Sequence, residues 1–487
     1  MASYKGHTAA LQLPLENGGD ANQANNKGWT PVFIASRKGH TAALQVLLEN
    51  GGDVNKASNK GTTPVSIASQ KGHTAALQLL LENGGDANQA NNKGTTPVSM
   101  ASYKGHTAAL KLLLENGGDA NQADNTGHSP VFVASQEGHT AALKVLLENG
   151  GDVKKAKNNG TTPVFMASQK GHTAALQLLL ENGGDANQAN NKGCTPVSIA
   201  SQNGHTAALQ LLLENGGDVN QATNDGRTPV FMASQNGHTA ALQLLLENGG
   251  DVNKANNNGT TPVFIASMKG QTAALKLLLE NGGDANQAKN NGCTPVSIAS
   301  QNGRTAALML LLENGADIHK ADGQGLLPVW IAADKGHTDA LHTLLKAGAN
   351  ARKAEWSGQP ALHMASQKGH LAVVRVLAEI WPLDRWPWKM FLMGGGAASE
   401  LQDYLMPPAN RTMRNFLPRL YSKPDMMKEI WKYLHKPRYV DVGQLDGHGR
   451  TAAQLAAQQG HMDIVEVLQG LGVDEGVGVA ADDGDSD

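Results

Sequence analysis

The sequence predicts an all-α solenoid, that is, a stack of short helix pairs that repeats along the chain. Three observations predict it. A proline recurs every 33 residues from Pro31 to Pro328, and the opening glycines from Gly28 to Gly358 mark eleven complete copies. Each copy contains two short apolar stretches separated by a glycine, as in PVFIASRKGHTAALQVLLEN. A fixed period of about 20 to 50 residues is typical of proteins that stack one structural unit.

Each copy predicts two short helices and a turn-rich finger. Thr30 can cap the first helix and Pro31 suits its first position, while Gly39 ends it after about two turns. Thr41 is placed to cap the second helix, which ends at Gly51. The polar stretch GGDVNKASNKG then forms the finger. Since helices this short are unstable alone, we expect neighbouring copies to supply their packing.

Length and composition place limits on the function. The chain has 487 residues with 40 basic and 43 acidic side chains, which gives no strong overall attraction to nucleic acid or membranes. It contains no apolar run of about 18 residues, as a membrane span requires, and no signal-peptide core near Met1. Cys194 and Cys293 lie three periods apart, or about 30 Å in a stack of helices, too far for a disulfide. We therefore expect a soluble, intracellular protein, cytoplasmic rather than nuclear.

The copy at 358–377, GQPALHMASQKGHLAVVRVL, carries a Leu-His pair as Leu362-His363. With eleven units at a spacing of 33 residues, this pattern resembles the ankyrin repeat over about 28–378 and 446–472. The resemblance implies two stacked helices per repeat, β-like fingers at right angles to them, and a concave face formed by fingers and first helices. It also implies an interaction module without enzymatic activity, in which the histidine ties the first helix to its own N-terminus.

The chain departs from this family pattern at the histidine position. The following position, a variable surface site in the family, is apolar from Ile34 to Ile331. Apolar residues on more than the core stripe of a short helix indicate either different helix packing or an unusually apolar inner surface. The residues at the histidine position are Phe33, Ser66, Ser99, Phe132, Phe165, Ser198, Phe231, Phe264, Ser297 and Trp330.

We expect five segments along the chain. The N-terminal segment begins inside a first helix, because Met1 aligns with Met100, and it has Pro14 where the other copies have leucine. Either the sequence is a fragment of a longer array or a partner covers this end, and we favour the fragment. The segments are an incomplete repeat at 1–24, the ankyrin-like array at 25–379, an insert at 380–440, a divergent repeat at 441–472 and an acidic, disordered tail at 473–487.

The insert at 380–440 contains 10 of the 20 aromatic residues of the chain. We expect a small helical lobe that covers the last repeat. Two alternatives remain open. Aromatic residues between Arg and Lys also suit nucleic acid or an acidic partner, and in an adaptor or substrate receptor the insert would recruit an enzyme such as a ubiquitin ligase. The insert contains no recognised RNA-binding or recruitment motif.

Repeated polar residues do not form a catalytic arrangement. Histidine recurs every 33 residues from His7 to His238, but neighbours lie about one helix diameter apart, too far to share a metal ion. We expect these rings to hydrogen-bond to loop backbone, with a pH-responsive role as the alternative. Aspartates from Asp20 to Asp317 occupy equivalent positions and so lack the unlike environments of an acid–base pair. We expect no enzymatic activity, no metal site and no cofactor.

We expect the chain to bind another protein through the concave face that the resemblance implies. Aromatic and arginine side chains contribute most at such interfaces, and the phenylalanines are expected to flank an apolar groove. The sequence argues against a small-molecule substrate and against nucleic acid as the partner. The predicted partner-binding residues are Trp29, Phe33, Ile34, Arg37, Lys38, His128, Phe132, Phe165, Arg227, Phe231, Phe264 and Trp330.

Overall fold

The computed structural model describes residues 8–351, 359–379 and 444–470, and within these ranges it contains helices and no strands. The insert at 380–440 and the tail at 473–487 lie outside the described residues. Contacts divide the chain into two units, residues 1–262 with 280–283 and residues 263–279 with 284–487. Each unit is built from stacked helix pairs, which confirms the predicted all-α solenoid.

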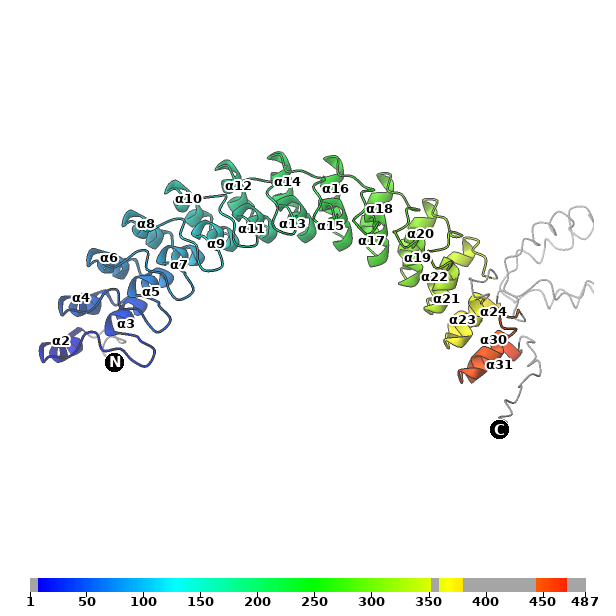
Figure 1. Ribbon diagram of the computed structural model, residues 1–487, viewed down its shortest axis with the longest axis horizontal. Coiled ribbons are helices and arrows are strands. Elements are labelled where there is room, and N and C mark those ends of the chain that lie inside the picture. Colours follow the sequence, from blue (N-terminus) through cyan, green and yellow to red (C-terminus); the bar gives the residue numbers. More distant parts are fainter. Residues whose placement is uncertain (1–7, 352–358, 380–443, 471–487) are drawn as a thin grey trace, which may run out of the picture. The chain divides into compact units, whose positions relative to one another are not determined.

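The helices of the first unit form two rows (Figure 1). First helices of consecutive repeats pack side by side, and each second helix packs on its own first helix and on the next second helix. The first helices are α3 (Pro31–Lys38), α5 (Pro64–Lys71), α7 (Pro97–Lys104), α9 (Pro130–Glu137), α11 (Pro163–Lys170), α13 (Pro196–Asn203) and α15 (Pro229–Asn236). The second helices are α2 (Thr8–Glu16), α4 (Thr41–Glu49), α6 (Thr74–Glu82), α8 (Thr107–Glu115), α10 (Thr140–Glu148), α12 (Thr173–Glu181), α14 (Thr206–Glu214) and α16 (Thr239–Glu247).

The first helices begin and end as predicted, but the second helices do not begin as predicted. The Thr30 hydroxyl accepts a hydrogen bond from Phe33 N at 3.1 Å, and Pro31 follows it in the first turn. Gly39 ends α3 in the left-handed conformation, with a φ of 69°. The expected cap at Thr41 is wrong, because Thr41 is already the first residue of α4 and the preceding histidine makes no side-chain cap bond.

The core of each repeat is small and nearly identical from copy to copy. Val32, Leu44 and Leu47 are fully buried, and so are the equivalent residues of the following repeats in the first unit. Each buried leucine contributes about 2 kcal/mol. Ser36 is also buried, and its hydroxyl donates to Val32 O at 2.8 Å, which satisfies it within the helix. Stability therefore comes from stacking these cores rather than from any single helix.

Helix α2 buries less than the helices that follow it. Pro14 lies inside α2 and is exposed, whereas Leu47 at the equivalent position of α4 is fully buried. Leu13 exposes 64 % of its surface, while Leu11 remains buried. Among the described residues of this first repeat, fewer apolar side chains of the second helix are therefore buried than in the repeats that follow.

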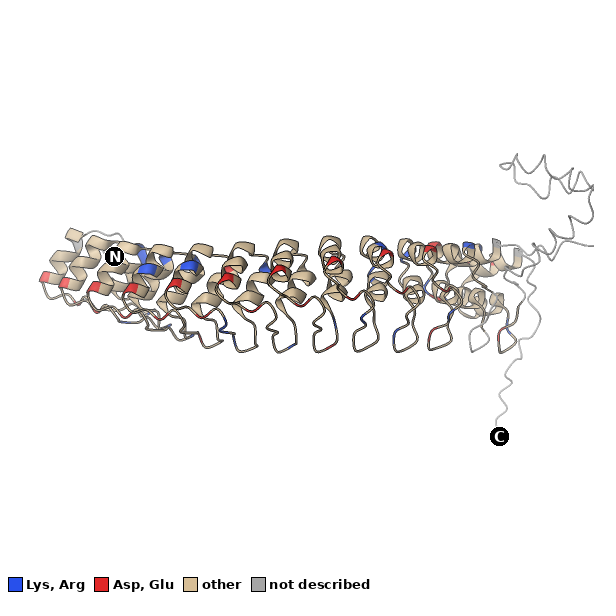
Figure 2. Cartoon of the chain, turned by 90° about the horizontal axis from the view of Figure 1, so that it is seen from above, with Lys and Arg blue, Asp and Glu red and all other residues tan. Residues whose placement is uncertain are grey.

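Side-chain amides connect the fingers, which project on one side of the helices (Figure 2). In the first unit Asn22 donates to Gly51 O at 2.9 Å and accepts from Asp53 N at 2.6 Å, so that one amide holds the base of the next finger. We call this pair of bonds the asparagine clamp. It recurs with both bonds at Asn55, Asn88, Asn121, Asn187 and Asn220.

The asparagine clamp is missing at one finger of the first unit. The equivalent residue is Lys154, whose side chain has no acceptor to offer to Asp185 N. A second connection is also missing between this finger and the next. Asn125 donates to Asn92 O at 3.3 Å and Asn224 to Asn191 O at 3.1 Å, but in the described residues no side-chain bond joins Asn191 to Asn158, although Asn191 N donates to Asn159 O at 3.0 Å. The fingers that begin at Asp152 and Asp185 are therefore the most weakly connected pair in the first unit.

Histidine side chains hold consecutive repeats together at the ends of the first helices. His73 Nε2 lies 3.2 Å from Arg37 O in the preceding repeat, and His172 and His205 make the equivalent contact at 3.1 Å. The His73 ring also covers Gly39, where an added Cβ would lie 2.8 Å from Nδ1. The rings bond to backbone as predicted, but the acceptor lies in the last turn of the preceding first helix and not in a loop.

Within the second unit the helices are again first and second helices of stacked repeats. Trp330 is buried there, and its Nε1 donates to Gln359 O at 3.0 Å. The first helices are α17 (Pro262–Lys269), α19 (Pro295–Gln301), α21 (Pro328–Asp334), α23 (Ala361–Gln367) and α30 (Ala452–Gln458). The second helices are α18 (Thr272–Glu280), α20 (Thr305–Glu313), α22 (Thr338–Lys346), α24 (Leu371–Glu379) and α31 (Met462–Gly470).

Helix α30 packs directly on α23 in the second unit, although the insert separates them in the sequence. His363 is fully buried on α23, and its Nε2 lies 3.1 Å from Arg450 O, just before α30. This corrects the expectation from the family, since the bond reaches the next helix pair rather than the N-terminus of α23. Burial lowers the pKa of His363, so its ring is neutral at neutral pH. None of the described helices combines the length and hydrophobicity that crossing a bilayer requires.

We predict that Lys154→Asn restores the asparagine clamp between the two weakly connected fingers. One added hydrogen bond contributes about 1 kcal/mol, so the amide of Asp185 should exchange with solvent about fivefold more slowly, as measured by hydrogen exchange. The matched control is Asn121→Lys, which removes an existing clamp and should accelerate exchange at Asp152 by a similar factor. Unchanged exchange in both variants would show that the clamp contributes nothing.

We predict that Gly105→Ala destabilises the array more than Gly117→Ala. Both glycines have positive φ, 68° and 78°, so both substitutions strain the backbone by about 1 to 2 kcal/mol. Only at Gly105 would the new Cβ meet a side chain, the His139 ring at 2.8 Å, whereas nothing lies within 4 Å at Gly117. Urea denaturation should show the difference, and His139→Ala should reduce it in the Gly105→Ala background. Equal midpoints for the two single variants would contradict the steric argument.

Candidate partner-binding face

The fingers and first helices of the first unit form one continuous surface, which we call the finger face. Two hollows lie on it, each between three consecutive fingers and the helices behind them. The N-terminal hollow has a volume of about 550 Å³ and the central hollow about 700 Å³. Both lie within the first unit.

The floor of the central hollow is apolar. Phe165, Cys194, Ile199 and Met232 form a buried cluster there, contributed by three consecutive repeats. Burial raises the pKa of the Cys194 thiol, against the opposing hydrogen bond from Ser198. The thiol is therefore protonated at neutral pH and is a poor nucleophile. In the second unit, burial likewise raises the pKa of Cys293 to about 11.

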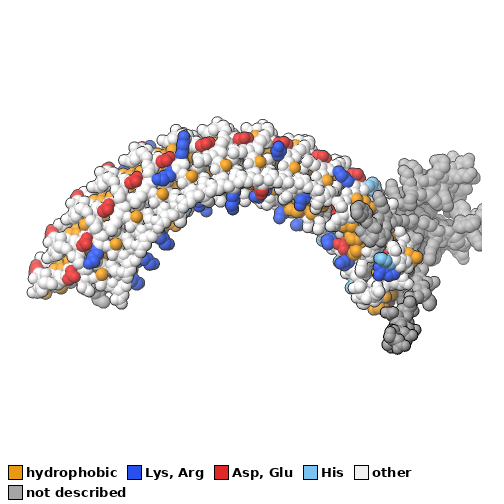
Figure 3. All heavy atoms as spheres, in the orientation of Figure 1, with side chains coloured by type: hydrophobic (Ala, Val, Ile, Leu, Met, Phe, Trp, Pro, Cys, Tyr) orange, Lys and Arg blue, Asp and Glu red, His pale blue; other side chains and the backbone are white. Residues whose placement is uncertain are grey.

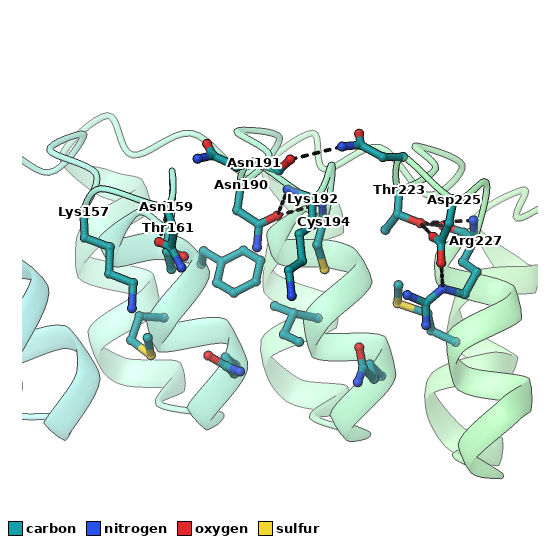
Figure 4. A pocket seen from close by; sticks show the side chains of 17 residues that line it. Lys157, Asn159, Thr161, Asn190, Asn191, Lys192, Cys194, Thr223, Asp225 and Arg227 are labelled. Carbon is teal, nitrogen blue, oxygen red and sulfur yellow. Dashed lines mark hydrogen bonds and ion pairs between the residues drawn. The ribbon is translucent and has the colours of Figure 1, made fainter. Parts of the chain in front are cut away.

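Cationic side chains extend from the fingers over this floor (Figure 4). They belong to Lys157, Lys192 and Arg227. Arg227 Nε lies 2.7 Å from Asp225 Oδ2 in an ion pair. Partial burial alone would raise the pKa of Asp225, but a hydrogen bond from Thr223 and the Arg227 charge together lower it. One of the three cations is thus neutralised within the protein.

The N-terminal hollow is organised around Trp29. Its ring stacks on Phe33 with centroids 5.6 Å apart and an interplanar angle of 17°. Lys27 Nζ lies 5.0 Å and Arg37 Cζ 4.6 Å from the Trp29 ring centroid, within the range of cation–π attraction. Lys60 and Lys71 also line this hollow. Two cations therefore lie over the Trp29 ring, and two more line the same hollow.

Comparison with known proteins decides the family. A family model described as ankyrin repeats (3 copies) matches residues 1–91, 67–157, 150–223, 230–322 and 297–382. The chain belongs to the ankyrin repeat family. Ankyrin repeats are in general protein–protein interaction modules, and proteins built from them are typically scaffolds rather than enzymes.

Solved structures of ankyrin repeats are similar to parts of this chain. The human ASB11 ankyrin repeat domain is 27 % identical, with a TM-score of 0.43 over 46 % of this chain and 99 % of that one. The ankyrin repeat domain of Bcl-3, titled a unique member of the IkappaB protein family, is 27 % identical, with a TM-score of 0.39 over 43 % of this chain and 95 % of its own. The comparison with curated proteins gave no match.

The structure brings some of the predicted partner-binding residues of the ankyrin array together and separates others. Trp29, Phe33 and Arg37 meet in the N-terminal hollow, and Phe165 and Arg227 in the central one. His128 lies between the hollows, with Nδ1 3.3 Å from Asp124 Oδ2 and its ring 5.0 Å from Phe132. Ile34 is half-buried and Lys38 is exposed, and neither lines a hollow. Phe264 and Trp330 belong to the second unit.

The exposure expected of the phenylalanines is wrong. Phe33, Phe132, Phe165, Phe231 and Phe264 expose between 0 and 4 % of their surface, and Trp330 exposes 7 %. The first helices that carry Phe132 and Phe165, α9 and α11, each have a neighbouring first helix on both sides, so their side chains are covered in more directions than on an isolated amphipathic helix. At most, Phe33 and Phe165 form part of a hollow's floor.

The sequence alone did not lead us to predict the lysines at the rims of the hollows. Lys27, Lys60 and Lys192 each stand directly before the opening glycine of a repeat, at the fingertip. Lys157 lies two residues earlier in its finger. The recurrence of lysine at the fingertip was a usable signal. Among the described residues, no group of three or more His, Cys, Asp or Glu side chains is arranged to hold a metal ion.

Proposed function

We propose that this ankyrin array is a scaffold that binds an extended segment of a partner protein on its finger face. The observation that carries the proposal is the pair of hollows on one face, each with an apolar floor and a polar rim. This combination is typical of sites that bind peptides by packing side chains into pockets and fixing their orientation with polar groups. The Cys194 thiol is protonated at neutral pH, so it acts as an apolar residue of the floor of the central hollow rather than as a nucleophile.

A second candidate function is an adaptor or substrate receptor that recruits an enzyme, such as a ubiquitin ligase, through the insert at 380–440. The observation that favours it is the concentration of aromatic residues in that segment, because aromatic side chains are frequent interface hot spots. A chain lacking 380–440 should then lose the enzyme while it retains the partner of the finger face. Loss of both, or of neither, would contradict the adaptor.

We predict that changes on the finger face release the partner and that matched changes on the second helices do not. Gln169→Glu with Gln202→Glu places two charges beside the central hollow. Gln177→Glu with Gln210→Glu places the same charges on α12 and α14, where both side chains are exposed. After affinity purification with the full chain, quantitative mass spectrometry should show at least about tenfold less partner with the first pair, as for lost hot-spot contacts. If both pairs retain the same proteins, the finger face is not the binding surface.

A further inference from the structure

We propose that the N-terminal hollow selects an acidic, extended segment of the partner protein, an inference that rests on the proposed scaffold function. Fourteen residues line this hollow, and four of them are cationic while none is a carboxylate. The cations are Lys27, Arg37, Lys60 and Lys71. In the part of the chain that the structure describes, none of the four forms an ion pair with a carboxylate. The surface therefore carries positive charge that its own chain does not neutralise.

The carboxylates of these repeats lie elsewhere. The second helices α4, α6 and α8 end at exposed glutamates, Glu49, Glu82 and Glu115. In the first unit, the acidic side chains visible in Figure 3 lie along the row of second helices, where some basic ones also lie, and further basic side chains lie along the inner edge. The chain as a whole has a net charge of −3. A positive hollow on a protein of this charge attracts acidic segments through the local rather than the overall field.

Trp29 fixes two of the cations in position before a ligand arrives. Its ring rests on Phe33, which is 3 % exposed and therefore anchored in the core. Lys27 and Arg37 lie over that ring at 5.0 and 4.6 Å. Long cationic side chains lose rotamer entropy when they bind a ligand, and holding them beforehand reduces that loss. Trp29 is thus a positioning residue for the charges rather than a stacking surface.

The same geometry favours a peptide over nucleic acid. Single-stranded nucleic acid binds where aromatic rings offer free faces to successive bases. The one tryptophan of this hollow is already engaged by Phe33 and by two cations. Gln70 and Asn91, which also line the hollow, supply amide groups that can hydrogen-bond to an extended peptide backbone.

The central hollow provides an internal comparison. It is also formed by three consecutive repeats and carries Lys157 and Lys192, but its arginine is paired with Asp225. It contains no tryptophan, and of its two lysines only Lys157 lies over an aromatic ring, that of Phe132 at 5.6 Å. Selectivity for acidic segments should therefore belong to the N-terminal hollow.

The test measures binding of two peptides to the full chain by fluorescence anisotropy. One is a fluorescein-labelled decapeptide of alternating Glu and Gly, and the other has Gln in place of every Glu. At low salt the Glu peptide should bind at least about tenfold more tightly, and raising the ionic strength to about 0.2 M should weaken it severalfold, because exposed charges are screened. Equal affinity for the two peptides, or no binding of either, would overturn the proposal.

Variants locate the binding to one hollow. Lys60→Gln with Lys71→Gln should weaken the Glu peptide about tenfold, whereas Lys157→Gln with Lys192→Gln should change it less than about twofold. All four lysines lie at the rims of the hollows, so circular dichroism should show unchanged folding. Trp29→Leu should weaken binding about threefold without reducing its salt dependence, since the cations remain. Equal effects of the two lysine pairs would overturn the assignment to the N-terminal hollow.

Three further outcomes would decide between this proposal, nucleic-acid binding and the scaffold function. If a ten-nucleotide oligothymidylate binds more tightly than the Glu peptide, the ligand of the N-terminal hollow is nucleic acid and not an acidic protein segment. Failure of the Glu peptide to bind, together with loss of the partner in Gln169→Glu with Gln202→Glu, would reject the acidic selectivity and leave the scaffold intact. Retention of the partner by that pair would reject the scaffold instead.

Discussion

The register of the array depends on one contact, a histidine ring that covers a glycine of the preceding repeat. The His139 ring lies over Gly105, where an added Cβ would be 2.8 Å away, and its Nε2 lies 3.1 Å from Tyr103 O. Two reasons require glycine at position 105: its φ is 68°, and a side chain there would displace the His139 ring. The contact is both steric and polar, so it fixes the distance and the rotation between neighbouring first helices. In the second unit, the side chain of Arg304 covers Gly270 in the same way.

The spacing of the helices in turn determines the spacing of the fingers. One asparagine amide reaches both Gly51 O and Asp53 N only because consecutive fingers are held at a constant separation. That separation also explains why each hollow on the finger face spans three repeats. Identical stacking thus supplies a uniform frame, and function depends on the few positions at which the repeats differ. Trp29, Cys194 and Arg227 occupy the same position in three different repeats and give each a different surface.

Sequence reasoning succeeded where a residue acts within its own repeat or on its nearest backbone neighbour. The Thr30-Pro31 helix start and the glycine helix ends belong to this class, whereas the histidine bonds reach the helix of the preceding repeat. It failed for Phe132, which is fully buried. An apolar pattern does not reveal whether an apolar side chain packs against a neighbouring helix or lines an open groove. It also missed Lys60 and Lys71. Their significance lies in the absence of a carboxylate nearby, and that depends on which residues the fold brings together rather than on residue type.

The one interruption of the asparagine clamp in the first unit lies beside a hollow rather than at a random place. Lys154 replaces the clamping residue, and three residues later in the same finger Lys157 lines the central hollow, as do Asn159 and Thr161. A finger with fewer bonds to its neighbour opens locally at a lower free energy than the rest of the array. Binding surfaces benefit from such segments, since the rim can adjust to a partner while the buried floor at Phe165 stays fixed. The most weakly connected pair of fingers in the first unit therefore lies at the rim of the central hollow.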